Sequence, residues 1–318
     1  MRFIGGKLLH LAVVLMAVTV LTFAMLDLLP ASTAHAVAGP TAAAEDIAAI
    51  RKELGLDDPS VVRYGRWLAG ALRGELGASH VSGQPVAEAL ASHLPVTVEL
   101  IVLAQLFALL LAVPVAILSA WRAESRFDRF FTTLGFGLTS IPSFALAVVL
   151  VYVFSLQLKW LPATGFVPLS AGIWPNLKGL LLPAVSIALV EWVILMRVLR
   201  SELIATLQED FILLARAKGL PDRKILLRHA LRPSLFGTLT VFGLQIGNLI
   251  GGAVIIEQLF ALPGVGRLLV SSIFAQDLPM VQGCVLLITL GYVAINFLVD
   301  VGYGLLDPRL AAKEARSG

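Results

Sequence analysis

Long apolar runs alternate with shorter polar stretches along the chain, and six runs are about 20 residues long, the length of a membrane-spanning helix. Lipid offers no hydrogen-bonding partner to a backbone amide, so each run is expected to be helical. The predicted spans are residues 8–30, 96–121, 131–156, 180–199, 235–256 and 281–305. Pro114, Pro142 and Pro183 are expected to kink their helices rather than end them. The pattern predicts an all-α polytopic membrane protein with six transmembrane helices.

The first apolar run allows two interpretations. Its basic start and the small residues Ala34 and Ala36 resemble a secretory signal. The run is about 20 residues long, however, which exceeds the apolar core of a usual signal peptide. The pattern favours a retained membrane anchor.

Composition agrees with a membrane protein and excludes several other classes. The chain is 58% hydrophobic and 14% charged, whereas a soluble domain has about half apolar and a quarter charged residues. The single cysteine, Cys284, lies in an apolar run and cannot form an internal disulfide. The five histidines lack the spacing of metal ligands, so we expect no metal site. The chain also lacks a GxxxxGK[ST] phosphate loop, so it is not expected to be an ATPase or an enzyme on its own.

The positive charges predict an orientation. With the N-terminus in the cytoplasm, 16 of the 24 Lys and Arg residues fall on the inner side, as the positive-inside rule requires. Both termini are therefore expected to be cytoplasmic. The predicted parts are an N-terminus and first span (1–30), an outer segment (31–95), a transmembrane core of five helices (96–305) with an inner loop at 210–232, and a tail (306–318).

The outer segment is expected to be a small helical cap outside the membrane. Ile47, Ile50 and Leu54 have helical spacing, and Gly55 follows them as a stop. Residues 61–77 have the same character. A disordered linker is disfavoured by this apolar content.

The inner loop is a charged stretch between two apolar runs, with six Lys or Arg residues in 210–233. Asp210 is predicted to cap a short helix that stops at Gly219, with Pro221 just beyond. Phe211, Leu214, Ala215 and Lys218 are predicted to share one face. A second helix, about 222–231, is expected to lead through Pro233 into the fifth span.

A basic loop could simply touch anionic lipid on the inner side. That interpretation explains the charge, but it does not explain a capped helix with exposed apolar residues. Exposed apolar side chains on such a loop suggest that the helix inserts into a partner protein.

Four stretches carry a resemblance to a known family. They are ARAKGLPDRKILLRHALRP (215–233), AVIIEQLFALPGVGRLLVSSI followed by QDLPMVQG (253–283), GYGLLDPRL (302–310) and LDLLPAS (26–32). The first resembles the EAA loop of bacterial ABC importer permeases, and together they resemble the first-named of two paired permeases in the dipeptide and oligopeptide group. The chain departs from that pattern at Pro221 and Asp222, where close relatives often carry Ser after the loop glycine. Pro suits a helix start, so the geometry is expected to survive.

The resemblance implies a type I importer fold in the bacterial cytoplasmic membrane. It implies a second homologous permease, two ATPase subunits or domains that bind ATP and Mg, and an extracytoplasmic binding protein that delivers peptide. This chain would itself bind no cofactor, and no nucleic acid is expected. The short helix would be the coupling helix, seated on an ATPase. Its expected coupling residues are Asp210, Phe211, Leu214, Ala215, Arg216, Ala217, Lys218 and Gly219.

Polar and small residues inside the spans are candidates for packing or for the transport path. Gly243, Gly247 and Gly251 repeat every four residues and permit close helix contact, either within the chain or with a partner permease. Gln245, Asn248 and Gln258 could line a polar path. Glu191 could meet a peptide amino group or pair with a cation such as Arg197, and we favour the pairing.

The sequence therefore favours a dipeptide or short-peptide permease. Permeases for nickel, glutathione or oligopeptides look alike and are the nearest alternatives. An ion-coupled secondary transporter or a membrane scaffold without transport are rivals from other classes. The cargo itself cannot be named from this chain.

Overall fold

The protein is built from helices. The computed structural model describes residues 2–27, 34, 38, 42–53, 55 and 57–306, and within these residues every named element is helical. The contacts divide the chain into two compact units, residues 1–98 with 262–293 and residues 99–261 with 294–318. The prediction of an all-α protein is confirmed. The predicted tail lies beyond the described residues, apart from Leu306.

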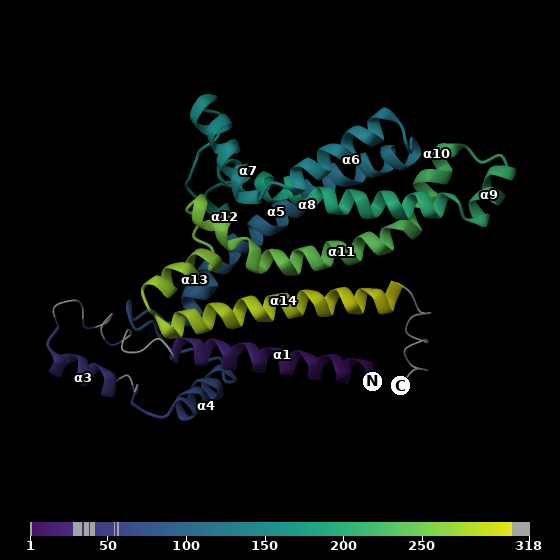
Figure 1. The fold of residues 1–318 in the computed structure, drawn as a ribbon. Helices are drawn as coiled ribbons and strands as arrows, with labels where there is room; N and C mark the ends of the chain where they lie inside the picture. The colour runs from purple at the N-terminus through teal and green to yellow at the C-terminus, as the bar shows by residue number, and fades with distance from the viewer. Residues whose placement is uncertain are drawn as a thin grey trace. The chain divides into compact units, whose positions relative to one another are not determined.

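The first unit contains the predicted outer segment. Its elements are α1 (Arg2–Asp27), α3 (Ala44–Glu53), α4 (Ser60–Ala71), α13 (Val265–Phe274) and the first parts of α5 (Val86–Trp121) and α14 (Leu278–Leu306) (Figure 1). Both helices predicted between 42 and 77 are present. Gly55 follows α3 with φ 62°, a backbone angle that suits glycine at a helix stop. Leu54 and most of 28–41 lie outside the described residues.

Two sets of contacts hold the outer segment to the longer helices of this unit. The Tyr64 hydroxyl lies 3.0 Å from Thr19 Oγ1, and the Tyr64 ring meets Phe23 edge-on with centroids 5.5 Å apart. In the loop before α5, the Asp277 carboxylate accepts hydrogen bonds from the Ser79 hydroxyl and from the His80 amide, the latter at 3.1 Å. Burial lowers the pKa of the His80 imidazole despite the nearby carboxylate. The segment is thus ordered.

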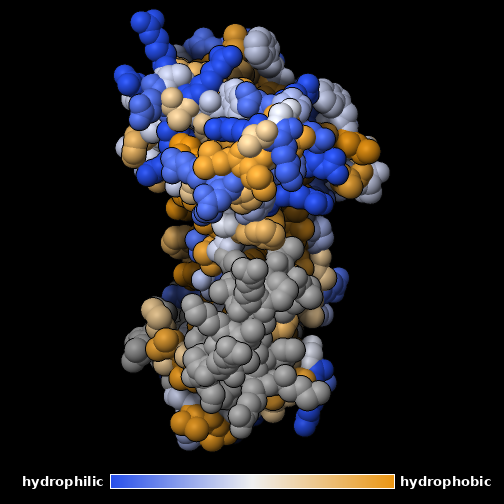
Figure 2. Space-filling model, turned by 90° about the vertical axis from the view of Figure 1, so that its right-hand side faces the viewer, coloured by the Kyte–Doolittle hydropathy of each residue, from blue (hydrophilic) through white to orange (hydrophobic). Residues whose placement is uncertain are grey.

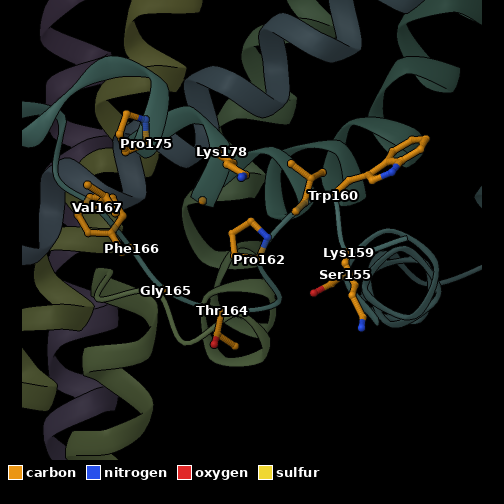
Figure 3. A pocket seen from close by; sticks show the side chains of 12 residues that line it. Ser155, Lys159, Trp160, Pro162, Thr164, Gly165, Phe166, Val167, Pro175 and Lys178 are labelled. Atoms are coloured by element: carbon orange, nitrogen blue, oxygen red, sulfur yellow. The ribbon is translucent and has the colours of Figure 1, made fainter. Parts of the chain in front are cut away.

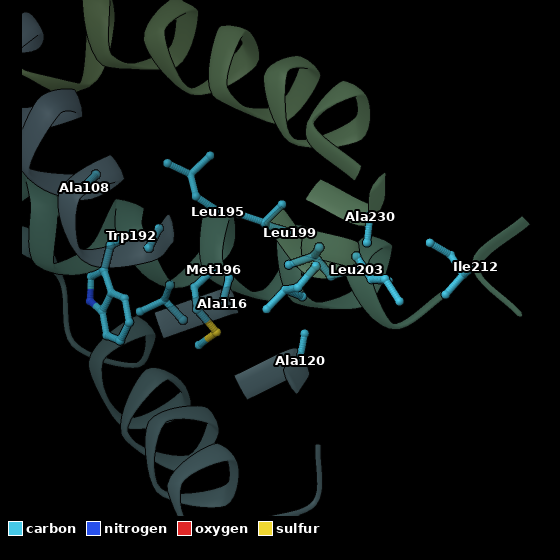
Figure 4. Close-up of a cluster of buried hydrophobic side chains, with 14 of the residues drawn as sticks. Ala108, Ala116, Ala120, Trp192, Leu195, Met196, Leu199, Leu203, Ile212 and Ala230 are labelled. Atoms are coloured by element: carbon cyan, nitrogen blue, oxygen red, sulfur yellow. The ribbon is translucent and has the colours of Figure 1, made fainter. Parts of the chain in front are cut away.

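The second unit is organised around α8 (Ile173–Leu207). Its other elements are α6 (Arg126–Thr139), α7 (Ser143–Leu150), η1 (Val151–Gln157), η2 (Leu169–Ala171), α9 (Asp210–Ala217), α10 (Asp222–Lys224), η3 (Ile225–Ala230), α11 (Leu231–Gly252) and α12 (Val254–Leu259). Helices α6, α7 and α11 all pack on α8. Buried alanines of α5, spaced four residues apart, face the same apolar cluster as Trp192, Met196 and Leu203 of α8 (Figure 4). Small side chains at this spacing let two helices approach closely.

Four described helices are long and apolar enough to cross a membrane. They are Val86–Trp121, Ile173–Leu207, Asp222–Gly252 and Leu278–Val299. The pair Arg126–Thr139 and Ser143–Gln157 makes a fifth span if it is counted as one, although it bends by 99°. In the described part of α1 only the shorter apolar helix Val13–Met25 is found. The predicted spans therefore correspond to helices, but the count of six is not reached among the described residues.

The prolines behave differently from one another. Pro114 and Pro183 lie within continuous helices, as predicted. Pro142 does not, because α6 ends at Thr139 and α7 begins at Ser143, directly after the proline. A residue before proline is disfavoured in the helical region, and the Ser140 hydroxyl bonds back to the Phe136 carbonyl at 2.8 Å. The prediction of a kinked but continuous third span is wrong at this point.

The stretch 222–252 forms one long helix rather than two. The helix predicted at 222–231 runs without a break into the fifth span. The π-helical turn η3 lies just before Pro233, whose missing N–H cannot bond to the carbonyl of His229. A wider turn accommodates such a gap. The inner loop is therefore fixed rigidly to α11.

Candidate functional site

The α9 helix forms as the sequence predicts, with a shift of one residue at its start. Glu209 is extended and occupies the capping position, while Asp210 is the first helical residue. The prediction of Asp210 as the cap is therefore off by one residue. Its carboxylate still lies in the first turn, where the helix dipole favours negative charge.

The end of α9 is a glycine-dependent stop. Gly219 has φ 72°, its N–H donates to the Arg216 carbonyl at 2.9 Å, and the Leu220 N–H donates to the Ala215 carbonyl at 3.3 Å. These two bonds form a Schellman motif. The prediction of Gly219 as the stop is confirmed. Pro221 then occupies the capping position of α10, with φ −63°, so the departure from the family pattern is accommodated.

We expect Gly219→Val to displace the end of α9 and to reduce transport. A Cβ at this position meets nothing within 4 Å, so the cost comes from the positive φ alone. For a residue with a side chain that cost is about 1 kcal/mol or more, and transport by the assembled system measures its effect. Gly219→Asn is the matched control, because Asn tolerates this conformation. Equal transport in both variants and the parent would contradict the role of the stop.

The two faces of α9 have opposite environments. Ile212 and Ala215 are buried in the apolar cluster that also contains Leu203 and Ala230 (Figure 4). Phe211 and Leu214 are 48% and 57% exposed. Ala215 was predicted to share their face, and this is wrong. The inner face is set by Ile212 and Ala215, three residues apart, which pack into the body of the unit.

Three large apolar side chains of α9 are therefore exposed, with basic residues beside them in the chain. They are Phe211, Leu213 and Leu214, and we call these three residues the α9 patch. The other predicted coupling residues with exposed side chains lie on α9 or at its C-cap; they are Asp210, Arg216, Ala217 and Lys218. Figure 2 looks onto the end of this unit and shows hydrophobic surface bordered by hydrophilic side chains. Leu213 was missed because it does not lie on the face that Phe211, Leu214, Ala215 and Lys218 were predicted to share.

A buried ion pair fixes α6 to α8 two turns before α8 ends. Arg200 donates to Asp128 through Nε and Nη2, both at 2.6 Å, and the Glu124 N–H donates to the same carboxylate at 2.9 Å. The Asp128 side chain is 4% exposed and that of Arg200 is 26% exposed. Such a forked contact holds both orientation and distance. It stiffens the helix that leads directly into α9.

The polar residues predicted for the transport path divide into two groups. Gln245 is buried, and its Nε2 donates to the backbone carbonyl of Glu191 at 3.1 Å. This bond joins α11 to α8 within the chain. Asn248 and Gln258 are exposed instead. The structure thus brings Gln245 and Glu191 together but does not gather the three amides at one site.

Glu191 is not paired with Arg197. Its Oε2 is buried and has no hydrogen-bond partner in the described structure, whereas the Arg197 guanidinium lies 4.7 Å from the centre of the Phe136 ring. Residues six apart on a helix do not share a face, so the pairing that we favoured is wrong. Gln105 on α5, which the sequence analysis missed, is also buried with both amide atoms unpartnered.

The glycine repeat of α11 has mixed surroundings. Gly243 lies against Val299 of α14, where a Cβ would clash with the valine side chain. Gly247 is buried, and Gly251 faces open space. Gly243 therefore serves packing within the chain, and only Gly251 is free for another contact.

Comparisons with known proteins cover almost the whole sequence. Residues 112–312 match the family described as binding-protein-dependent transport system inner membrane component, and residues 1–101 match the N-terminal region of such membrane components. A Brucella abortus protein whose name assigns it to a peptide transport system as a permease is 42% identical over 93% of this chain and 95% of its own length.

Two further relatives have names with a stated cargo. A glutathione transport system permease of Salmonella paratyphi A is 37% identical over 98% of this chain and all of its own length. A dipeptide transport system permease of Alkalihalophilus pseudofirmus is 33% identical over 96% of this chain and 97% of its own length.

Proposed function

Because this chain belongs to the family of binding-protein-dependent transport system inner membrane components, we propose that it forms part of the path of a peptide importer and couples to an ATPase through α9. The chain is a permease subunit of an ABC importer for peptides and a multi-pass protein of the inner membrane. It is not itself an enzyme. The cargo that we propose is a dipeptide or another short peptide, consistent with the dipeptide and glutathione relatives.

The α9 patch carries the proposal for coupling. Three large apolar side chains, each about half exposed, project from a helix that is anchored by Ile212 and Ala215. Full burial of a fully exposed side chain of this kind contributes about 1.5–3 kcal/mol, so these half-exposed side chains would contribute about half of that each when a partner covers them. We propose that the α9 patch inserts into a cleft of an ATPase subunit on the cytoplasmic side.

The attachment of α9 suggests how motion would pass into the membrane. Only Gln208 and Glu209 separate α9 from α8, and the same apolar cluster joins it to η3. Displacement of α9 would therefore move α8 and α11 together, since neither junction contains a long flexible linker. When the two ATPase subunits close around ATP, they would move α9, and its short junctions with α8 and α11 would pass this movement to the membrane helices.

The remaining parts of the assembly are proposed by family. They are a second homologous permease, two ATPase subunits that bind ATP and Mg, and an extracytoplasmic binding protein that delivers the peptide. We propose that both termini of this chain lie in the cytoplasm, a proposal supported by the distribution of Lys and Arg residues. A nickel importer is the remaining alternative within the class, and an ion-coupled transporter would have no use for the α9 patch.

Site-specific crosslinking tests the proposed contact. A photoactivatable residue at position 214, in membranes that contain the whole transport system, should crosslink to the ATPase subunit. The same residue at Leu110, which is 69% exposed on the span α5, is the control and should crosslink to lipid or to membrane partners. A position-214 product that contains no ATPase would show that the α9 patch serves another contact.

A further inference from the structure

A cavity outside the α9 region lies between the end of η1 and the start of α8. It has a volume of about 550 Å³ and is formed by residues between Ser155 and Gly179. Lys159 and Lys178 line it together with Trp160, Pro162 and Phe166 (Figure 3). The hydroxyls of Ser155 and Thr164 also border it. The lining therefore combines positive charge, hydroxyl groups and apolar surface.

The walls of this cavity are built by specific contacts rather than by a loose loop. The backbone N–H of Trp160 donates to the Phe154 carbonyl at 2.9 Å and so fixes the chain just after η1. Asn176 Nδ2 donates to the Val167 carbonyl and to Glu99 Oε2, both at 2.9 Å. Gly179 lies so close to the Gly165 carbonyl that a Cβ would come within 2.8 Å of its oxygen. The cavity is therefore a preformed feature of the second unit.

The two lysines are available for a ligand. Within the described part of the chain, neither ammonium forms an ion pair with a carboxylate. Lys159 also has φ 56°, which is uncommon for a residue with a side chain. Two positive groups at one cavity, next to two hydroxyls, suit an anion with several oxygen acceptors. A phosphate group meets this requirement.

The surroundings of the cavity indicate whether the phosphate belongs to a lipid or to a water-soluble anion. Trp160 and Trp174 are 62% and 74% exposed, and Ile173 beside them is 67% exposed. The cavity lies at the start of the span Ile173–Leu207 and at the end of the bent helix pair that forms a span if it is counted as one. Exposed tryptophans with lysines at a span end are typical of the membrane–water interface. A water-soluble anion would gain nothing from this apolar border.

We propose that this cavity binds the headgroup of an anionic phospholipid. Lys159 and Lys178 contact the phosphate, the hydroxyls of Ser155 and Thr164 donate to its oxygens, and Trp160 packs on the glycerol and upper acyl chain. The site is independent of the α9 patch and of peptide coupling. A lipid at this position would brace the connection between η1 and α8 in the membrane.

Retention of phosphatidylglycerol by the purified full-length chain tests the proposal, with native mass spectrometry as the readout. Each substitution, Lys159→Gln or Lys178→Gln, should weaken retention about fivefold, and the double variant about 25-fold, since each surface cation contributes on the order of 1 kcal/mol toward anionic lipid. Lys159→Arg with Lys178→Arg keeps the charge and should retain the lipid. Lys52→Gln, an equal loss of charge on exposed α3, should have no effect.

Three results would overturn the proposal. One is unchanged phosphatidylglycerol retention in the double glutamine variant. Another is displacement of the lipid by millimolar inorganic phosphate, which would make the ligand a soluble anion. A third is unchanged lipid binding together with lost docking of the extracytoplasmic binding protein, which would assign the cavity to a protein partner. Lys159→Gly, which suits the positive φ, shows whether any loss arises from misfolding, because it should fold normally and still lose lipid.

Discussion

Leu214→Glu should reduce ATP-driven uptake by about fivefold or more without unfolding the chain. Leu214 is 57% exposed at the centre of the α9 patch, so a carboxylate is well hydrated when no partner is present. In a docked state the same carboxylate would lie unpaired in an apolar contact, at a cost of roughly 1–3 kcal/mol. That cost weakens the docking equilibrium by about 5–150-fold. Uptake of labelled peptide by membranes with the complete system measures the effect.

Lys218→Ala is the control for this experiment. If the loop only holds anionic lipid, loss of the Lys218 charge should reduce uptake as much as Leu214→Glu does. Ala215→Glu is not a suitable probe of docking, because Ala215 is 8% exposed and faces the chain's own core. Normal uptake and normal ATPase copurification in the Leu214→Glu variant would contradict a docking role for the patch.

Asp128→Ala should produce the largest loss of stability among substitutions in the second unit's polar network. It leaves the Arg200 guanidinium without its carboxylate and removes the acceptor of the Glu124 N–H. Breaking a buried pair by deleting one partner costs about 3–5 kcal/mol. The partial exposure of Arg200 places the expected value at the lower end. The free energy of unfolding of the purified chain in mixed detergent measures it.

The double variant Asp128→Leu with Arg200→Met is the matched comparison. It removes both charges and replaces them with apolar groups, so its stability should lie much closer to that of the parent than the stability of Asp128→Ala does. Equal losses in the single and double variants would mean that the pair contributes nothing beyond its separate side chains.

Periodicity in the sequence was sufficient to predict where the helices lie, but not which side of each helix is buried. Helical spacing and glycine stops placed α3, α4 and α9, and the positive φ of Gly55 and Gly219 agrees with those predictions. The orientation of α9 could not be read in the same way. Its inner face depends on the cluster that α8, η3 and α9 form together, and the sequence alone does not show which of the apolar residues Phe211 and Ala215 faces that cluster.

The errors inside the membrane have more than one cause. Pro142 and Pro183 both lie in apolar runs, yet Pro142 stands at a break between two helices and Pro183 lies within α8. Asp128 and Arg200 are 72 residues apart, so no local pattern could pair them. Glu191 was assigned to Arg197 by proximity in sequence, although a spacing of six places them on different sides of a helix. Only the pairing of Asp128 with Arg200 depends on contacts between distant elements.

Transport by the purified system in liposomes tests the central claim most directly. Proteoliposomes that contain this chain, its partner permease and the ATPase subunits should accumulate a labelled dipeptide when the binding protein is supplied on one side and ATP on the other. Omission of this chain, or replacement of ATP by a non-hydrolysable analogue, should abolish accumulation. Accumulation that persists without ATP hydrolysis and follows an imposed ion gradient would contradict the assignment to ATP-driven import.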